Sequence, residues 1–264
     1  MNGEGLQHED GHSLLLASTN PACVSYDPAY AYELGHIVRD ALHRMYGEPG
    51  ENIFYYLSIY NEPFPQPAEP DDVDVEGILA GLHRVSAAGP DSEGPRAQIL
   101  ASGIAVPWAL AASGALAADW GVHADVWSVT SWTELRREAI AVDEWNLMHP
   151  EDEARTPYVT RRLADAPGPV VAVSDWMRAV QDQIAPYVPR DFASLGTDGF
   201  GLSDTRGALR RHFKVDAPSI VLRVLEQLVK RGEKDRSVLR EAIDRYQLED
   251  VAAAPTGNTE ATGE

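Results

Sequence analysis

The chain has 264 residues, and its 22 Lys and Arg against 41 Asp and Glu give a net charge of −19. This acidic balance argues against nucleic acid or an anionic membrane surface as a partner, because both require clustered basic side chains. The single cysteine, Cys23, excludes a disulfide framework and a cysteine-rich zinc cluster. No apolar run reaches the ~18 residues of a membrane span, and the polar N-terminus lacks a secretory signal. We therefore expect a cytoplasmic protein of one large or two modest domains.

The first part of the chain predicts one helix and one strand. A helix is predicted from about residue 27 to residue 46, with Asp27 as its cap and Pro28 in its first turn. Residues 52–60 are apolar on both faces and rich in aromatic side chains, which is typical of a buried parallel strand. Residues 61–76 then contain four prolines and several acidic residues, so we interpret them as an interdomain linker.

After the linker, predicted strands and helices alternate. The strands are expected at residues 98–106, 124–132, 170–174 and 192–195. The helices between them are expected at residues 107–120, 133–148 and 176–187. This alternation predicts an α/β fold with a mostly parallel sheet and helices on both faces. Two further apolar stripes predict helices near residues 220–229 and 238–246, and the polar residues 251–264 predict a disordered tail.

The segment from His8 to His12 reads His-Glu-Asp-Gly-His and fits the letters of the H-E-x-x-H zinc-protease signature. That signature needs a helix that places both histidines on one face, whereas Asp-Gly is a turn pair. A zinc hydrolase therefore stays a minor alternative. A polar loop with many titratable groups, including Glu4, His8 and His12, instead suits hydrogen bonding to a small charged substrate and proton transfer near neutral pH. A merely solvated loop is the competing interpretation.

Two other features are weaker candidates. The glycine-rich segment 196–201 follows a predicted strand and suits either an anion-binding loop or a turn with positive φ. His36, His43 and His83 fall in helical patterns, and we expect them to be surface residues or hydrogen-bonded partners.

Several long strings of the sequence also occur together, in the same order, in one known family. They are residues 2–13, 25–33, 44–48, 125–135, 145–150, 195–201 and 230–233. They resemble the thiamine-dependent, decarboxylating first component of the pyruvate dehydrogenase complex, in its single-chain homodimeric bacterial form. The resemblance implies a transketolase-like architecture. Residues 1–60 would be the C-terminal part of a pyrimidine-binding domain, 61–76 the linker, and 77–250 a transketolase C-terminal-like α/β domain.

The resemblance also implies an activity. In this family, thiamine diphosphate with Mg²⁺ decarboxylates pyruvate, and the acetyl group passes to a lipoyl group of the acetyltransferase component. His8 then matches a histidine that hydrogen-bonds the substrate or intermediate and relays a proton, Glu4 a nearby acidic position, and His12 a neighbour of both.

The family's magnesium and diphosphate motif, Gly-Asp-Gly followed later by Asn, is absent from this sequence. The main cofactor contacts are therefore expected upstream of Met1, and the chain is expected to be a fragment that is inactive alone. The alternative is a non-catalytic dimerisation module, or the small subunit of a split 2-oxoacid dehydrogenase.

Overall fold

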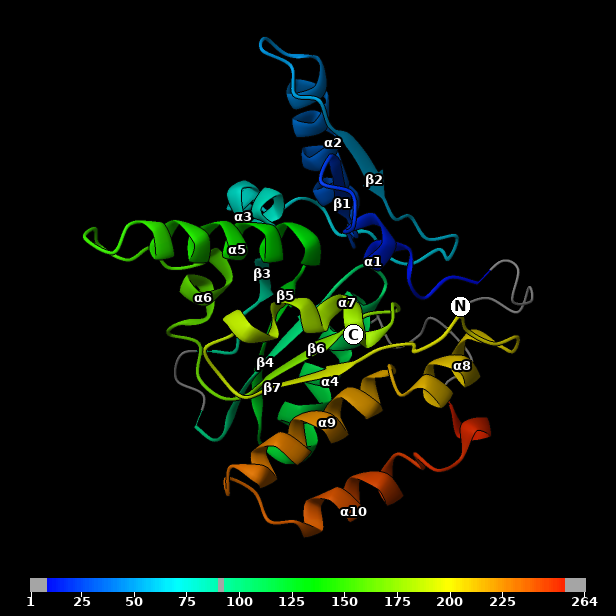
Figure 1. The fold of residues 1–264 in the computed structure, drawn as a ribbon. Helices are drawn as coiled ribbons and strands as arrows, with labels where there is room; N and C mark the ends of the chain where they lie inside the picture. The colour runs from blue at the N-terminus through cyan, green and yellow to red at the C-terminus, as the bar shows by residue number, and fades with distance from the viewer. Residues whose placement is uncertain (1–8, 90–92, 255–264) are drawn as a thin grey trace.

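The computed structural model describes residues 9–89 and 93–254, which are arranged around two sheets (Figure 1). In the smaller sheet, β1 (Cys23–Tyr26) pairs in parallel with β2 (Phe54–Leu57). The larger sheet has the strand order β3-β5-β4-β6-β7. Its strands are β3 (His83–Ser86), β4 (Arg96–Ala101), β5 (His123–Ser128), β6 (Val170–Val173) and β7 (Phe192–Leu195). Only the β3–β5 pairing is antiparallel among the described strands, which confirms the predicted α/β fold.

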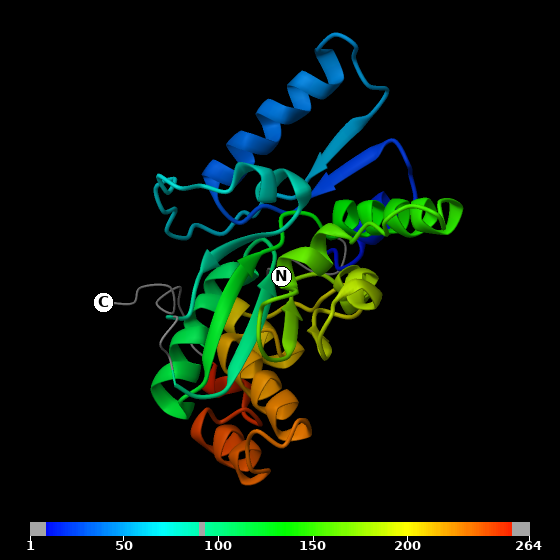
Figure 2. The same cartoon turned by 90° about the vertical axis from the view of Figure 1, so that its left-hand side faces the viewer.

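Helices cover both faces of the larger sheet (Figures 1 and 2). On one face, the apolar core contains α4 (Ala105–Trp120) and α9 (Ala217–Lys230), and α10 (Ser237–Arg245) packs on the outside of α9. The core on the other face contains α5 (Trp132–Met148), α6 (Tyr158–Leu163), α7 (Arg178–Gln181) and the 3₁₀ helix η2 (Asp182–Tyr187). Helix α8 (Arg206–Phe213) precedes α9.

The central strands are buried on both faces, which explains why they read as continuous apolar runs. Along β6, Val171 and Val173 enter the core beneath α4 and α9, whereas Val170 and Ala172 enter the opposite core. This alternation follows from the two-residue period of a strand. The predicted strands at residues 170–174 and 192–195 are thereby confirmed to within one residue.

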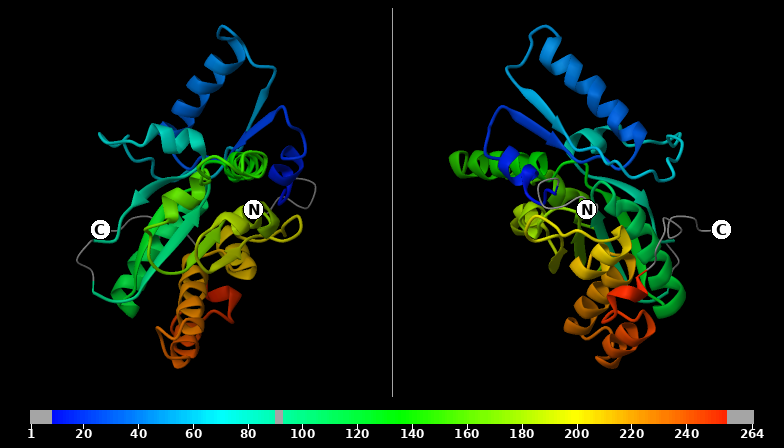
Figure 3. Two further views of the ribbon diagram at one scale, coloured as in Figure 1. Left: turned by 60° about the vertical axis from the view of Figure 1, so that its left-hand side comes forward. Right: turned by 90° about the vertical axis from the view of Figure 1, so that its right-hand side faces the viewer.

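The smaller sheet lies above the carboxyl ends of the larger one (Figure 3). It packs with α2 (Ala31–Tyr46) and α3 (Val75–Ala80), and Val24, Ile37 and Ile78 form part of their shared core. The short helix α1 (Ser13–Ala17) precedes β1. Residues 61–74 form no helix or strand, and α3 begins at Val75, inside the segment predicted as a linker.

Several local expectations were wrong. Asp27 does not cap α2; the helix begins after Tyr30, and the Glu33 carboxylate accepts the backbone N–H groups of Ala29 and Tyr30. The helix predicted at residues 176–187 is divided into α7 and η2, and Pro186 lies within η2. His83 lies on β3 and not on a helix.

The disordered tail predicted at residues 251–264 falls partly within the described residues. Val251–Ala253 forms the 3₁₀ helix η3, and Ala254 after it is buried, so the chain is still ordered where a disordered tail was predicted to begin. The rest of that prediction, residues 255–264, lies outside the described residues.

The Asp27 side chain joins the two sheets. It directly follows β1 and is 1% exposed. Its Oδ2 accepts hydrogen bonds from Ser102 Oγ at 2.6 Å and Trp176 Nε1 at 3.0 Å, after β4 and β6 respectively. Its Oδ1 accepts one from the Tyr60 hydroxyl at 2.8 Å, beyond β2. The Asp27 backbone adds two links, because its N–H donates to Thr130 O and its carbonyl accepts from Gly103 N.

Burial raises the pKa of Asp27 to about 6, because the carboxylate loses its hydration. Hydrogen bonds from Ser102, Tyr60 and Trp176 act in the opposite direction by stabilising the charged form, and the Asp175 carboxylate adds to the increase. Since the unfolded value is ~3.9, the folded chain binds more protons than the unfolded chain between pH 4 and pH 6. Ionised Asp27 therefore lowers the stability as the pH rises through this window.

We expect Asp27→Asn to remove this pH dependence. The amide oxygen can accept the Ser102 and Trp176 bonds, and the amide nitrogen can donate to the Tyr60 oxygen. Relative to Asp27→Asn, the parent chain should lose ~2 kcal/mol of unfolding free energy between pH 4 and pH 7. Urea unfolding of both proteins across this range measures the difference. If the unfolding free energies of both proteins changed equally with pH, the raised pKa of Asp27 would be contradicted. Asp27→Ala, which leaves all three donors without their acceptor, should be destabilised at every pH.

Candidate functional site at the carboxyl ends of the strands

Loops that follow the strands of both sheets meet at one edge of the molecule. Open parallel sheets bind ligands at this edge, where successive strands lie on opposite sides of a central strand. Here β4 has β5 on one side and β6 on the other, so this switch point lies at β4. Asp27 occupies the position between the loops after β4 and β6. A ligand site at this edge therefore lies beside Asp27.

The loop at residues 9–13 lies next to this position and begins α1. Asp10 Oδ1 accepts the backbone N–H groups of His12 at 2.8 Å and Ser13 at 2.9 Å, and the Ser13 hydroxyl donates to Asp10 Oδ2. Asp10 thus satisfies the N–H groups of His12 and of Ser13, the first residue of α1, and fixes the backbone on which His12 is placed.

The zinc-hydrolase alternative requires a helix that the structure does not contain. Residues 9–12 form no helix, and α1 begins only at Ser13. Within residues 9–89 and 93–254, no group of three or more His, Cys, Asp or Glu side chains is arranged to hold a metal ion. His12 therefore does not lie within a helix as the signature requires, and His8 lies outside the described residues.

The loop at residues 9–13 rests on the glycine-rich segment after β7. The Gly11 carbonyl accepts a hydrogen bond from Met177 N at 2.7 Å. A Cβ atom at Gly11 would lie 2.3 Å from Gly199 O and 3.0 Å from Thr197 O, so only glycine fits. Gly199 and Gly201 both have positive φ, which confirms the predicted turn. The segment therefore supports the first loop.

His12 is the one predicted catalytic residue within the described part of the chain. Its side chain is about one third exposed, with Nδ1 3.6 Å from Asp10 Oδ1. Its ring meets the Phe200 ring edge-on, with centroids 4.9 Å apart. An accessible imidazole held in this way can donate, accept or transfer a proton. Glu4 and His8 lie outside the described residues, so their roles stay predictions.

Glu9, three residues before His12 in the chain, is half-buried and has a buried carboxylate. Both carboxylate oxygens of Glu9 are inaccessible to solvent, and neither accepts a hydrogen bond from any residue in the described ranges. A Cβ atom at Gly201 would lie 2.9 Å from Glu9 Oε2, so the glycine leaves room for this carboxylate. A buried carboxylate needs a donor or a cation. The Glu9 carboxylate is therefore a second candidate for contact with a ligand.

Sequence reasoning missed the cluster around Asp27. Tyr60, Ser102 and Trp176 lie 33, 75 and 149 residues from Asp27 in the chain. One signal was present, because Asp27 directly follows the apolar string of residues 23–26, where the carboxyl end of a strand places functional side chains.

Comparisons with known proteins agree with this geometry. The model of the transketolase-like TK C-terminal domain matches residues 81–216, and the model of the pyruvate dehydrogenase E1 component middle domain matches residues 1–67. The chain therefore belongs to the transketolase-like family. Transketolase from Leishmania mexicana superposes with a TM-score of 0.60 at 19% identity, over 87% of this chain and 28% of that one. A split-gene transketolase, described as an inactive beta4 tetramer, gives 0.58 at 20% identity, over 85% and 63%.

Within this family, the chain is similar to the C-terminal part of pyruvate dehydrogenase E1 components. It is 59% identical to that of Mycolicibacterium smegmatis over 254 residues, which cover 96% of this chain and 27% of the relative. It is 57% identical to that of Mycobacterium tuberculosis, over 98% of this chain and 28% of the relative. The Escherichia coli K12 protein is 46% identical over 94% and 28%. The chain thus spans little more than a quarter of the length of these relatives.

The transketolase-like family is thiamine-dependent, and the residues present can be compared with what thiamine diphosphate requires. Its diphosphate is bound through Mg²⁺, which prefers oxygen ligands such as carboxylates. The sequence lacks the Gly-Asp-Gly motif, and the described residues provide no metal-ligand cluster. The metal and diphosphate end therefore does not fit the described residues. The described residues instead provide the loop at residues 9–13 and the segments that pack against it.

We expect Gly11→Ala to displace the loop at residues 9–13. The new methyl group would overlap Gly199 O, and the strain should destabilise the chain by about 1–3 kcal/mol. Amide hydrogen exchange at residues 9–13 should accelerate. Gly114→Ala is the matched control, because Gly114 is exposed within α4 and its added Cβ meets nothing within 4 Å. That control should be neutral or stabilising by up to ~1 kcal/mol. If amide hydrogen exchange at residues 9–13 were unchanged in Gly11→Ala, the close packing of Gly11 against Gly199 would be contradicted.

Proposed function

We propose that this chain forms part of the active site of a pyruvate dehydrogenase E1 component in the cytoplasm. The reaction is the oxidative decarboxylation of pyruvate with thiamine diphosphate and Mg²⁺, followed by acetyl transfer to a lipoyl group of the acetyltransferase component. The observation that supports this most is identity of 57–59% over 96–98% of the chain to relatives named pyruvate dehydrogenase E1 component. When bound by the complete protein, thiamine diphosphate would supply the electron sink that decarboxylation of a 2-oxo acid requires.

The chain's own contribution is to position groups and transfer protons. His8 hydrogen-bonds the substrate or intermediate and relays a proton during acetyl transfer, with Glu4 and His12 as its neighbours. Contacts of two neighbouring residues in the described ranges support this proposal. Asp10 accepts the N–H groups of His12 and Ser13 at the start of α1. Gly11 holds the loop against Met177 and Gly199.

The chain works only together with further protein, in this proposal as part of a homodimer. Helix α2 supports the idea, because Val38, Leu42 and Tyr46 repeat every four residues along one stripe and are 38%, 54% and 78% exposed. Phe54 on the adjacent β2 is 48% exposed. Apolar side chains gathered in this way mark a surface that contacts protein. The same surface favours the alternative, a non-catalytic dimerisation module or the small subunit of a split 2-oxoacid dehydrogenase.

An assay of the purified chain separates a complete enzyme from an incomplete one. With thiamine diphosphate, Mg²⁺, pyruvate and an artificial electron acceptor, we expect no turnover above background. Addition of the cofactor-binding part of a pyruvate dehydrogenase E1 component should restore turnover. Robust activity of the chain alone would refute the proposal that it contains only part of the active site. A complex that forms but stays inactive would favour the dimerisation module.

The role of His8 is tested in such a reconstituted enzyme. We expect His8→Ala to lower the rate of acetyl transfer to a lipoyl group by about 10²–10⁴-fold, as for loss of a general acid–base catalyst. Decarboxylation measured with the artificial acceptor should fall less, because it does not require the same proton transfer. His43→Gln, an exposed position on α2, is the matched control and should leave both rates unchanged. Equal loss of both rates would assign His8 to substrate binding.

A further inference from the structure

A cavity of about 410 Å³ lies toward the amino ends of the parallel strands, at the opposite end of the sheet from the loop at residues 9–13. Three arginines from three elements line it: Arg84 on β3, Arg96 at the start of β4, and Arg162 on α6. Its volume lies within the range of roughly 300–1,000 Å³ that is typical of small-molecule sites.

Three arginines around one cavity are unusual in this chain, because its net charge is −19. Two carboxylates also line the cavity. Asp125 is already engaged, because its Oδ1 accepts the Ala88 N–H at 2.7 Å and lies 3.5 Å from Arg96 Nη2. Asp165 is exposed to solvent. Three guanidinium groups therefore line the cavity with two carboxylates, and of these two only Asp125 is paired with one of the three arginines.

One of the three guanidinium groups has a buried donor without an acceptor, and a second has no charged partner in the described residues. Arg84 is exposed to solvent at the cavity, forms no ion pair or hydrogen bond with any residue of the described ranges, and has its guanidinium carbon 5.6 Å from the centre of the Trp127 ring. Arg96 Nε is buried and likewise has no acceptor there. Arg162 differs, because its Nη2 lies 2.7 Å from Asp74 Oδ2. Buried N–H groups are almost always paired, so the Arg96 donor indicates a missing acceptor.

We propose that this cavity binds a small molecule through its phosphate or carboxylate group, which Arg84 and Arg96 hold. Planar guanidinium groups donate in a fork that matches both anions. The anion supplies the acceptor that Arg96 Nε lacks and the counter-charge that Arg84 lacks. Ala87, Ala166 and Pro167 form apolar wall on which the uncharged part of the molecule rests.

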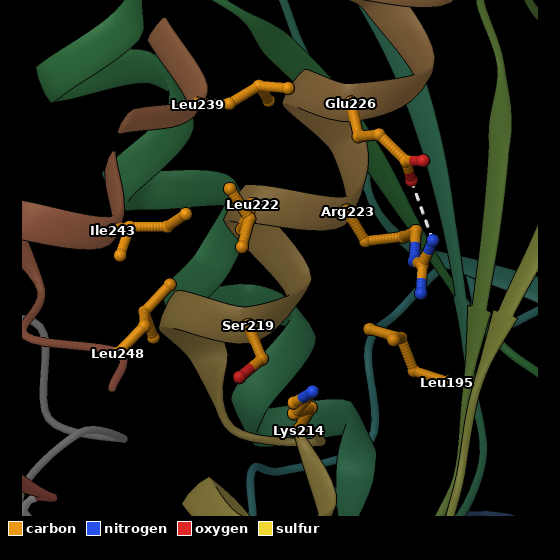
Figure 4. Close-up of a pocket in the computed structure, with 9 residues that line it drawn as sticks. All are labelled: Leu195, Lys214, Ser219, Leu222, Arg223, Glu226, Leu239, Ile243 and Leu248. Atoms are coloured by element: carbon orange, nitrogen blue, oxygen red, sulfur yellow. Dashed lines mark hydrogen bonds and ion pairs between the residues drawn. The ribbon is translucent and has the colours of Figure 1, made fainter. Parts of the chain in front are cut away.

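The cavity between β7, α9 and α10 does not have this character (Figure 4). It measures about 280 Å³, and most of its lining is aliphatic. Its one arginine, Arg223, donates to Glu226 Oε2 at 2.6 Å, so its charge is already compensated. Arg223 therefore offers a matched control: an arginine that lines a cavity but has no unmet charge.

The test is titration of the full chain with sodium phosphate and, separately, sodium acetate, at ionic strength held constant with sodium chloride. Calorimetry should show binding of at least one anion, and the anion that binds identifies phosphate or carboxylate as the recognised group. Arg84→Gln should weaken that binding at least tenfold, whereas Arg223→Gln should stay within twofold of the parent. Circular dichroism checks that each variant is folded.

A second readout does not depend on the variants. In ¹⁵N spectra of arginine side chains, the Arg96 Nε–H signal should shift on titration with the same midpoint as the calorimetric binding. Absence of binding by both anions would overturn the proposal. So would binding that Arg84→Gln leaves unchanged, or an Arg96 signal that does not respond.

Discussion

The buried carboxylate of Asp27 fixes the relation between the two sheets. It occupies the place between β4 and β6 where an open α/β sheet binds its ligand. Desolvation of a carboxylate is costly, and the three side-chain donors that meet it offset part of the cost. Because these donors come from three separate loops, the carboxylate aligns all of them. The position between the loops after β4 and β6 in the larger sheet is therefore occupied by a side chain of the smaller sheet's connecting segment, which attaches the smaller sheet there.

This alignment determines where the candidate site can lie. Trp176 donates to Asp27, and the neighbouring Met177 donates to the Gly11 carbonyl. The loop after β6 therefore connects the Asp27 cluster directly to the loop at residues 9–13. The absence of a side chain at Gly11 permits close contact with Gly199 on the loop after β7. His12 is placed by backbone contacts of this kind, which depend on the packing of two loops distant in sequence.

The sequence predicts what depends on local pattern. Strands β6 and β7 and helix α5 were foreseen because each depends on a local pattern, the alternation of strand-like and helix-like segments along the chain. In the structure, Ser131 Oγ accepts the Glu134 N–H at the start of α5. Strand β3 was missed because it is short, lies at the sheet edge and carries His83 and Arg84. His83 is buried against Glu33, 50 residues away, at 2.7 Å. Contacts of this kind, like those of Asp27, cannot be derived from periodicity. His12 was found through a family-specific string.

Basic side chains are scarce in this acidic chain, so their partners are informative. Arg211 is buried, donates to Asp216 at 2.6 Å, and also donates to the carbonyls of Tyr246 and Gln247, which ties α8 to the segment after α10. Arg206 and Arg210 both pair with Glu62 and hold α8 against the proline-rich segment. These arginines join segments that are distant in sequence. Arg84 does not, although it lines a cavity with two other arginines. Arg84 is exposed at that cavity, so an anion that enters from solvent can reach its guanidinium group.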